Sequence, residues 1–222
     1  MRLLLMDTCG SEGSVALADT DAGGVIARQT LPGRSASERL LPVVREMMTV
    51  AGWKLAELRA IVVVHGPGSF TGVRVGLSAA KGLSEAGGVG LIAISRLAVL
   101  AGLSDVAGER CAVLDAGRGE FYLGLYKDGD GDCVREALVT GEGLREAAQG
   151  GAAVIVCEEK MAEALGDLGP VKVREPLAED ALAIALARAE AGAFDDAALI
   201  DANYLRRTDA EIFAKPVQGT AR

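Results

Sequence analysis

The stretch from His65 to Ser78, HGPGSFTGVRVGLS, constrains the fold more than any other part of this chain, because it places four glycines between a predicted strand and a predicted helix. The strand is the β-branched run 60–64, a pattern typical of a sheet that is buried on both faces. It stops at Gly66, and Thr71 is placed to cap the helix that follows. The sequence therefore predicts a strand, a glycine-rich turn and a helix, and we call residues 65–78 the glycine elbow.

A glycine-rich turn before a helix can hold a phosphate, because its free backbone N–H groups and the helix dipole both favour anions. The spacing does not fit a P-loop, since counting from Gly66 puts Thr71, Gly72 and Val73 where Gly-Lys-Ser/Thr is needed. The segment 66–72 is also one residue too long for the dinucleotide-binding fingerprint. From the residues alone, we rank a packing role for these glycines above anion binding and keep both readings open.

The longer segment GPGSFTGVRVGLSAAKG resembles the signature of the bacterial TsaB family, the partner subunit in threonylcarbamoyladenosine modification of tRNA. Further matches follow in the family's order over most of the chain: LLLMDT with GSVAL after it, SERLLP at 37–42, LDAGRGEFYLGLY, and Tyr204-Leu205-Arg206. The resemblance implies an α/β fold of the actin, Hsp70 and sugar-kinase group. This is the actin-like ATPase (ASKHA, ribonuclease H-like) fold, with two duplicated domains of mixed sheet and helices.

The residues themselves also indicate a duplication. A strand, an aspartate, a glycine-containing turn and a second strand occupy residues 3–18, and the same order returns from Arg110 to Tyr126. We expect two domains, residues 1–103 and 104–222, with the glycine elbow and the dimerisation helices in the first.

Asp7 and Asp115 end the first strand of each copy. In relatives with this fold, such strand-end aspartates handle nucleotide and Mg²⁺, which makes these two weak nucleotide candidates. The alternative, which we favour, is a carboxylate satisfied by N–H groups of its own turn, because the lysines and extra carboxylates of a kinase-like site are not evident.

Turn and cap signals divide the rest of the chain into further elements. Ser35 and Glu38 have capping-box spacing, and Gly52 is placed to end the helix that follows them. We also expect strands at 25–30, 90–94, 133–140 and 152–157, and helices at 95–100, 142–149, 158–165 and 177–191, with a short helix carrying Tyr204 and a mobile tail at 214–222.

Composition excludes several functions. A net charge of −8 and a pI near 4.8 disfavour strong direct binding of tRNA by this chain, and aromatic residues are only 4%. The cysteines, Cys9, Cys111, Cys133 and Cys157, have no metal-ligand spacing and are typical of buried thiols in a reducing compartment. No apolar run has the length of a membrane span, so we expect a cytoplasmic protein without a membrane association.

Catalytic chemistry is also scarce in the sequence. His65 is the one histidine, and a packed, hydrogen-bonded role suits its position at a strand end. The sister subunit TsaD carries a metal-binding His-x-x-x-His on the helix after the next strand, where this chain has Arg96 and Leu100. We therefore expect no catalytic residue, no bound metal and no cofactor held by this chain. Ala36 replaces a histidine that is common in TsaB proteins just before the SERLLP segment.

The resemblance implies a non-catalytic dimerisation or scaffold subunit that binds TsaD, with the ATPase TsaE joining the assembly and ATP or ADP possible in the complex. TsaD would transfer threonylcarbamoyl to N6 of adenosine 37 in tRNAs that read ANN codons. When alone, the chain would form a homodimer. The alternative, from another class, is an independent kinase-like ATPase or a peptidase of the actin-like fold.

Two helices of the N-terminal half are more apolar than one buried stripe requires, and the resemblance implies that they form the shared interface with TsaD or with a second copy. The small residues on the second helix suit close contact with another helix. A charged residue at Leu41 or Val73 is expected to block pairing and to leave the fold intact. The predicted interface residues are Leu40, Leu41, Val44, Met47, Met48, Gly72, Val73, Gly76, Leu77 and Ala80.

Overall fold

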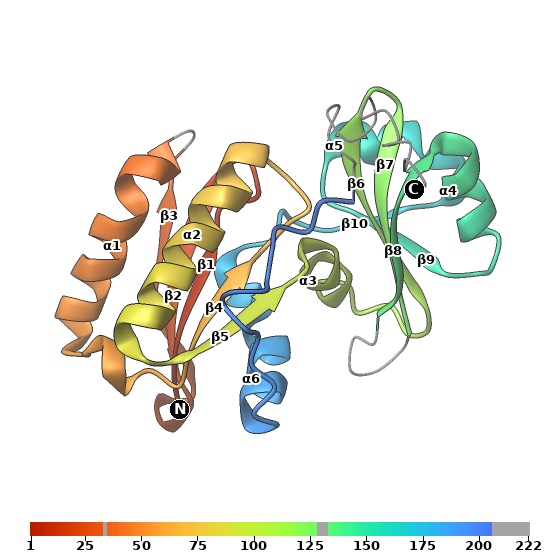
Figure 1. The fold of residues 1–222 in the computed structure, drawn as a ribbon. Helices are drawn as coiled ribbons and strands as arrows, with labels where there is room; N and C mark the ends of the chain where they lie inside the picture. Colours follow the sequence, from red (N-terminus) through yellow and green to blue (C-terminus); the bar gives the residue numbers. More distant parts are fainter. Residues whose placement is uncertain (33–34, 128–132, 206–222) are drawn as a thin grey trace, which may run out of the picture.

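The first of two five-stranded sheets forms around the N-terminal strand (Figure 1). The computed structural model describes residues 1–32, 35–127 and 133–205, so Arg206 and the expected tail at 214–222 lie outside the described residues. The strand order is β3-β2-β1-β4-β5. The strands are β1 (Arg2–Asp7), β2 (Gly13–Asp19), β3 (Gly24–Leu31), β4 (Ala60–Val64) and β5 (Gly90–Ile94).

Strand β1 is central because it pairs with β2 antiparallel and with β4 parallel. Every residue of β4 is buried, and since successive side chains point to opposite faces, both faces of this sheet must be covered. One face carries α1 (Ala36–Ala51) and α2 (Phe70–Gly87), which lie side by side in Figure 1. The other contacts the 3₁₀ turn η5 (Ala178–Ala181) and α6 (Leu182–Glu190), whose buried alanines belong to the same core.

The second sheet repeats this plan with the order β10-β9-β6-β7-β8. Read from β8, the order β8-β7-β6-β9-β10 matches β3-β2-β1-β4-β5 strand for strand, which confirms the expected duplication and the α/β actin-like fold. Its elements are β6 (Arg110–Gly117), β7 (Glu120–Tyr126), β8 (Cys133–Thr140), α4 (Gly141–Ala148), β9 (Ala153–Val156), α5 (Glu159–Ala164) and β10 (Val171–Lys172).

The packing differs from the expected division at residues 103 and 104. Helix α3 (Arg96–Gly102) precedes that boundary, yet Leu97 and Leu100 pack in a core with β6, β7 and β9 of the second sheet. The alanines of η5 and α6 come after it, yet they pack on the first sheet. Each half of the chain thus supplies a helical segment that covers the sheet of the other half: α3 covers the second sheet, and η5 with α6 covers the first.

Several local predictions need correction. The capping box is not formed, because the Ser35 hydroxyl donates to the Pro32 carbonyl (2.7 Å) instead of receiving an N–H of α1. The cap of α2 is Ser69, whose Oγ accepts from Gly72 N, and Thr71 lies inside the helix. The expected alanine-rich helix 177–191 is divided into η5 and α6, and Tyr204 lies in a segment without helix.

The glycine elbow has a packing role that two of its residues explain. Gly66 has φ of +106°, which side chains disfavour. A Cβ on Gly68 would lie 2.4 Å from the Cys9 carbonyl oxygen, and Ser69 N–H donates to that same oxygen (2.9 Å). The elbow therefore lies directly against the turn between β1 and β2.

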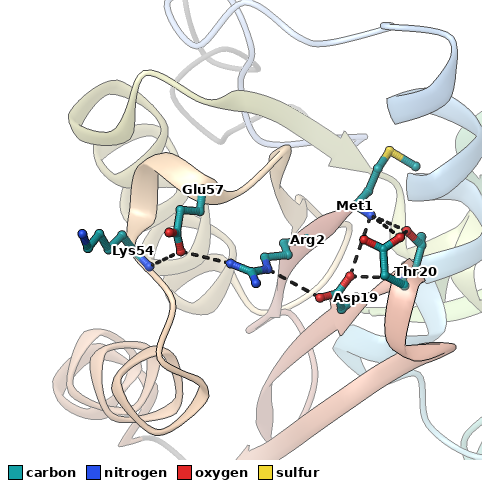
Figure 2. A network of polar contacts seen from close by, with 7 residues as sticks. Met1, Arg2, Asp19, Thr20, Lys54 and Glu57 are labelled. Atoms are coloured by element: carbon teal, nitrogen blue, oxygen red, sulfur yellow. Dashed lines mark hydrogen bonds and ion pairs between the residues drawn. The ribbon is translucent and has the colours of Figure 1, made fainter.

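Polar contacts fix the opposite end of the first sheet (Figure 2). Arg2, at the start of β1, donates to Glu57 Oε2 (3.0 Å) and pairs with Asp19 at the end of β2 (3.5 Å). Glu57 belongs to the 3₁₀ turn η3 (Leu55–Glu57) and also accepts from Lys54 N–H (2.9 Å), while the Met1 amino group donates to Thr20 of η1 (Thr20–Ala22). These contacts hold β1 in register with β2 and with the loop that enters β4.

The cysteines are all free, and their burial differs from the prediction. Cys9 and Cys111 are buried, Cys157 is half-buried, and Cys133 is exposed because it begins β8 at the edge of the second sheet. Within the described ranges, no helix is long and apolar enough to cross a membrane.

Candidate functional site

A cavity of about 530 Å³ opens between the two halves of the molecule. The turn after β1, the glycine elbow and α3 contribute one side, and β6, the start of α5 and the segment after β10 contribute the other. Its lining residues are Cys9, Gly10, Ser11, Gly68, Ser69, Arg96, Asp115, Cys157, Glu158, Lys160 and Glu175.

Asp7 and Asp115 make the same local contact. Asp7 Oδ1 accepts from Cys9 N–H and Asp115 Oδ1 accepts from Gly117 N–H, both at 2.7 Å and both two residues on. One oxygen of each carboxylate therefore accepts a hydrogen bond from an N–H group of its own turn, as we expected in preference to nucleotide binding.

The second oxygens of these carboxylates differ. Asp115 Oδ2 accepts from Lys160 (2.7 Å), and this hydrogen bond, together with the Gly117 N–H, holds the pKa of Asp115 below its usual range. Asp7 is 2% exposed, and its Oδ2 has no hydrogen-bond partner among the residues that the structure describes. Burial raises the pKa of Asp7, although nearby Arg96 and the Cys9 N–H oppose that rise.

Arg96 is the buried cation of the cavity. Its side chain is 7% exposed, and its Nη2 donates to Glu175 Oε1 at 2.7 Å. Burial opposes the charge of the guanidinium, but the surrounding negative groups, chiefly Asp7, more than offset burial and raise the pKa of Arg96. Arg96 therefore remains positively charged between two carboxyl groups.

His65 is half-buried at the end of β4 and is hydrogen-bonded there. Its Nδ1 lies 3.1 Å from the Asp201 carbonyl oxygen, and its backbone bonds to Ile94 and Asn203. No group of three or more His, Cys, Asp or Glu side chains is placed to hold a metal ion among the residues that the structure describes.

The predicted interface residues lie mostly inside the chain. Leu41 is 52% exposed, whereas Gly72 is half-buried and the other eight are buried in the fold. The physical reason is that the apolar stripe of α1 and the inner side of α2 cover the first sheet, so their side chains belong to its core. Val73, at 3% exposure, is therefore not a surface position, and a charge there would disrupt the fold itself.

The small-residue stripe of α2 also faces inward. A Cβ on Gly72 would lie 1.9 Å from the Thr8 carbonyl oxygen, and one on Gly76 would lie 2.5 Å from Thr8 Oγ1. Thr8 Oγ1 in turn donates to the Gly72 carbonyl (2.6 Å). The stripe permits close contact with the end of β1, and the expected contact with another helix is wrong for these side chains.

Comparison with known proteins gives the family. The family model described as "TsaD: tRNA N6-adenosine threonylcarbamoyltransferase" matches residues 14–174. The TsaB protein of tRNA threonylcarbamoyladenosine biosynthesis from Escherichia coli is 36% identical over 130 residues. A solved Pseudomonas aeruginosa structure, described as an uncharacterized protein with similarity to peptidase YEAZ, is 30% identical with a TM-score of 0.76, covering 92% of this chain and 99% of that one. The chain belongs to the TsaB (YeaZ-like) family.

Other TsaB and YeaZ comparisons agree with this assignment. The Bacillus subtilis TsaB protein is 35% identical over 129 residues, and "YeaZ from Pseudomonas aeruginosa" has a TM-score of 0.71 at 27% identity. The alignments with the E. coli and B. subtilis proteins cover 57% of this chain and 55% and 56% of those proteins, so the chain spans about half the length of these curated relatives.

Ala36 borders a second cavity, of about 420 Å³. Ala36, at the first turn of α1, lines this cavity with Ser37, and the N-terminal turn of α2 lies on its border. An imidazole at position 36 would bring a polar group to this surface, where the chain instead has a methyl group.

No pattern in the sequence indicates the pairing of Glu175 with Ser11. The two residues are 164 positions apart, and neither belongs to a motif that links them. Arg96 did stand out, but as a replacement for a metal ligand and not as a buried partner of a carboxylate.

Proposed function

We propose that this chain is a non-catalytic subunit that pairs with TsaD, in an assembly that TsaE joins. In that assembly TsaD transfers threonylcarbamoyl to N6 of adenosine 37 in tRNAs reading ANN codons. The observation that carries the proposal is the match over both sheets to a YeaZ-like structure, together with relatives named for threonylcarbamoyladenosine biosynthesis.

The cavity between the halves supports a non-catalytic role. The strand-end carboxylates that would handle a nucleotide each have one oxygen held by their own turn, and Asp115 is also paired with Lys160. The ring of His65 contacts a backbone carbonyl and, within the described part of the chain, no carboxylate, so its geometry does not resemble that of a general base in a triad.

The proposed docking surface is the outer face of α1 and α2. Its apolar residue on α1 is Leu41, which is 52% exposed although the inner sides of both helices are already buried. If one face serves both pairings, a homodimer and a pair with TsaD exclude each other. Because the chain has a net charge of −8, we propose that its partners, and not this chain, contact the negatively charged tRNA. We also propose that it acts in the cytoplasm.

Reconstitution of threonylcarbamoyl transfer tests this function. TsaD and TsaE from the same organism are incubated with tRNA, threonine, bicarbonate, ATP and the enzyme that makes threonylcarbamoyl-adenylate, with and without this chain. We expect modified adenosine only when the chain is present, and none from the chain without TsaD. Equal modification in its absence would refute the proposal.

An independent ATPase or peptidase is the second candidate, and the word peptidase in the description of the P. aeruginosa structure is what favours it. The purified chain alone is assayed for ATP hydrolysis and for cleavage of an unfolded protein. Turnover well above background, abolished by Asp7→Asn together with Asp115→Asn or by His65→Ala, would favour this candidate over the subunit.

A further inference from the structure

Three side chains form an exposed stack at the start of α2. Phe70 and Arg74 lie one turn apart on this helix, and Tyr204 comes from the segment after α6. Arg74 Cζ lies 3.4 Å from the centre of the Phe70 ring and 5.4 Å from that of the Tyr204 ring, and the two ring centres are 5.9 Å apart. All three side chains are exposed. We call Phe70, Arg74 and Tyr204 the aromatic–arginine cluster.

The residues on both sides of Tyr204 hold its ring in place. Asn203 N–H donates to the His65 carbonyl (2.9 Å), and the side-chain amide of Asn203 donates to Glu136 Oε2 on β8 (2.6 Å). Leu205 packs in the core beside the second sheet. In Figure 1 this segment belongs to the blue trace that leaves α6 and crosses from the first half to the second. The ring is therefore in position before a partner arrives, which lowers the entropic cost of binding.

Arg74 has hydrogen-bonding capacity to offer. No hydrogen bond or ion pair joins it to another residue in the described part of the chain. Stacking uses the faces of a guanidinium, whereas its five N–H donors lie in its plane and stay available. This planar fork of donors suits a carboxylate, which can accept two parallel hydrogen bonds. The cluster thus presents a pre-positioned cationic donor to an acidic group from outside the chain.

The cluster continues the proposed docking surface along α2. Phe70, Arg74 and Ser78 follow one another at steps of four and are all exposed, whereas Val73 and Leu77 on the inner side are buried. Aromatic and arginine side chains are also enriched among the residues that dominate binding in protein interfaces. Rings and an arginine would suit RNA as well, but the net charge of −8 disfavours that ligand. The observations therefore favour a protein partner.

We propose that the aromatic–arginine cluster receives a carboxylate of the TsaD partner. Arg74 donates both hydrogen bonds to that carboxylate, and Phe70 and Tyr204 hold the plane of the guanidinium. Because Tyr204 lies on the segment that is tied to the second sheet, the second half of the chain helps to build a docking site on the first. This inference rests on the proposed pairing with TsaD.

The test is calorimetric titration of the full chain with TsaD from the same organism, at low and at high salt. Arg74→Lys keeps the charge but loses the planar fork, and we expect it to weaken the pairing about tenfold. Arg74→Gln should weaken the pairing further and make the remaining affinity less dependent on salt, because salt screens a charge pair. Circular dichroism should show both variants folded, since Arg74 is exposed.

Two further sets of variants show whether Tyr204 acts through Arg74. Tyr204→Phe keeps the ring and should pair as wild type does, whereas Tyr204→Leu should weaken the pairing about threefold. Tyr204→Leu should have no additional effect when Arg74→Gln is already present. Arg135→Lys is the matched control, because it makes the same exchange at an exposed position on β8, and it should leave the affinity unchanged.

Self-association of the chain and binding of an RNA oligonucleotide are measured in parallel. Wild-type pairing by Arg74→Lys, or equal losses in Arg74→Lys and Arg135→Lys, would overturn this inference and leave the proposed function standing. Self-association or RNA binding that falls in Arg74→Lys while pairing with TsaD does not would assign the cluster to another ligand and also overturn it. No complex between the wild-type chain and TsaD would refute the proposed function, and this inference with it.

Discussion

At the scale of single residues, the charges of the cavity are set by their neighbours more than by their own chemistry. Asp7 and Asp115 occupy equivalent turns, yet burial raises the pKa of the first while the Lys160 hydrogen bond lowers the pKa of the second. Glu175 follows Asp115: burial alone would raise its pKa, but Ser11 and Arg96 hold it below its ordinary value of 4.5. The pKa values of two aspartates in equivalent turns are thus shifted in opposite directions.

The pKa of Glu175 predicts how stability depends on pH. The unfolded chain binds this proton near pH 4.5 and the folded chain only below that, so the contribution of the charge is complete above about pH 5 and is lost as pH falls. We expect wild type to exceed Glu175→Gln by about 0.5–1 kcal/mol at neutral pH, a modest value because the side chain is 40% exposed.

Denaturant unfolding from pH 7 to pH 3 measures this difference. It should shrink as pH falls below 4.5, because the charge of Glu175 is lost there. A difference between wild type and Glu175→Gln that does not change with pH would contradict the assigned contacts.

At the scale of elements, α2 depends on how closely it approaches the end of β1. Gly72→Ala places a methyl group 1.9 Å from a backbone oxygen that cannot rotate away, and it should destabilise the protein by about 1–3 kcal/mol. Gly82→Ala, in the same helix, meets nothing within 4 Å and should stabilise it by about 0.5–1 kcal/mol. Thermal unfolding of both variants measures the two changes in stability. Equal changes of the same sign would contradict the packing of α2 against the end of β1.

Elements defined by local chemistry could be predicted from the sequence. The run 60–64 forms β4, and α1 ends at Gly52 as expected. The repeated hairpins are β1–β2 and β6–β7. Cap assignments failed where several hydroxyls compete within a few residues, as at Ser69 and Thr71. The absence of a helix at Tyr204 followed from its tertiary contacts, since Asn203 N–H donates to the His65 carbonyl (2.9 Å).

The inner and outer sides of helices were harder to predict. The helix around Leu40 to Met48 shows large apolar side chains on more than one stripe, and the sequence cannot tell which of them a sheet will cover. The structure buries Leu40, Val43, Val44, Met47 and Met48 and exposes Leu41. Small residues at a spacing of four suit close approach of any backbone, and in α2 that backbone is the end of β1 and not a second helix.

At the scale of the whole molecule, the exchange of helical segments joins the two halves. Helix α3 packs on the second sheet and η5 with α6 packs on the first, so neither sheet retains a covered core without the other half of the chain. We therefore expect one cooperative unfolding transition, in which the fluorescence of Trp53 and the far-ultraviolet circular dichroism change together. Two separated transitions would show that the halves fold independently.

We propose that this chain acts by pairing with TsaD through the outer face of α1 and α2. Leu41→Glu tests it most directly, because Leu41 is the exposed member of the predicted set and a charge there disturbs no core. Leu199→Glu is the matched control, since Leu199 is 81% exposed on the segment after α6. Both variants should retain the wild-type unfolding free energy within about 0.5 kcal/mol.

The decisive measurement is sedimentation equilibrium of each variant with TsaD from the same organism. We expect Leu41→Glu to weaken the complex at least about tenfold, because an unpaired charge would be buried in the interface, while Leu199→Glu pairs as wild type does. Wild-type affinity of folded Leu41→Glu for TsaD, or no complex with the wild-type chain itself, would contradict it.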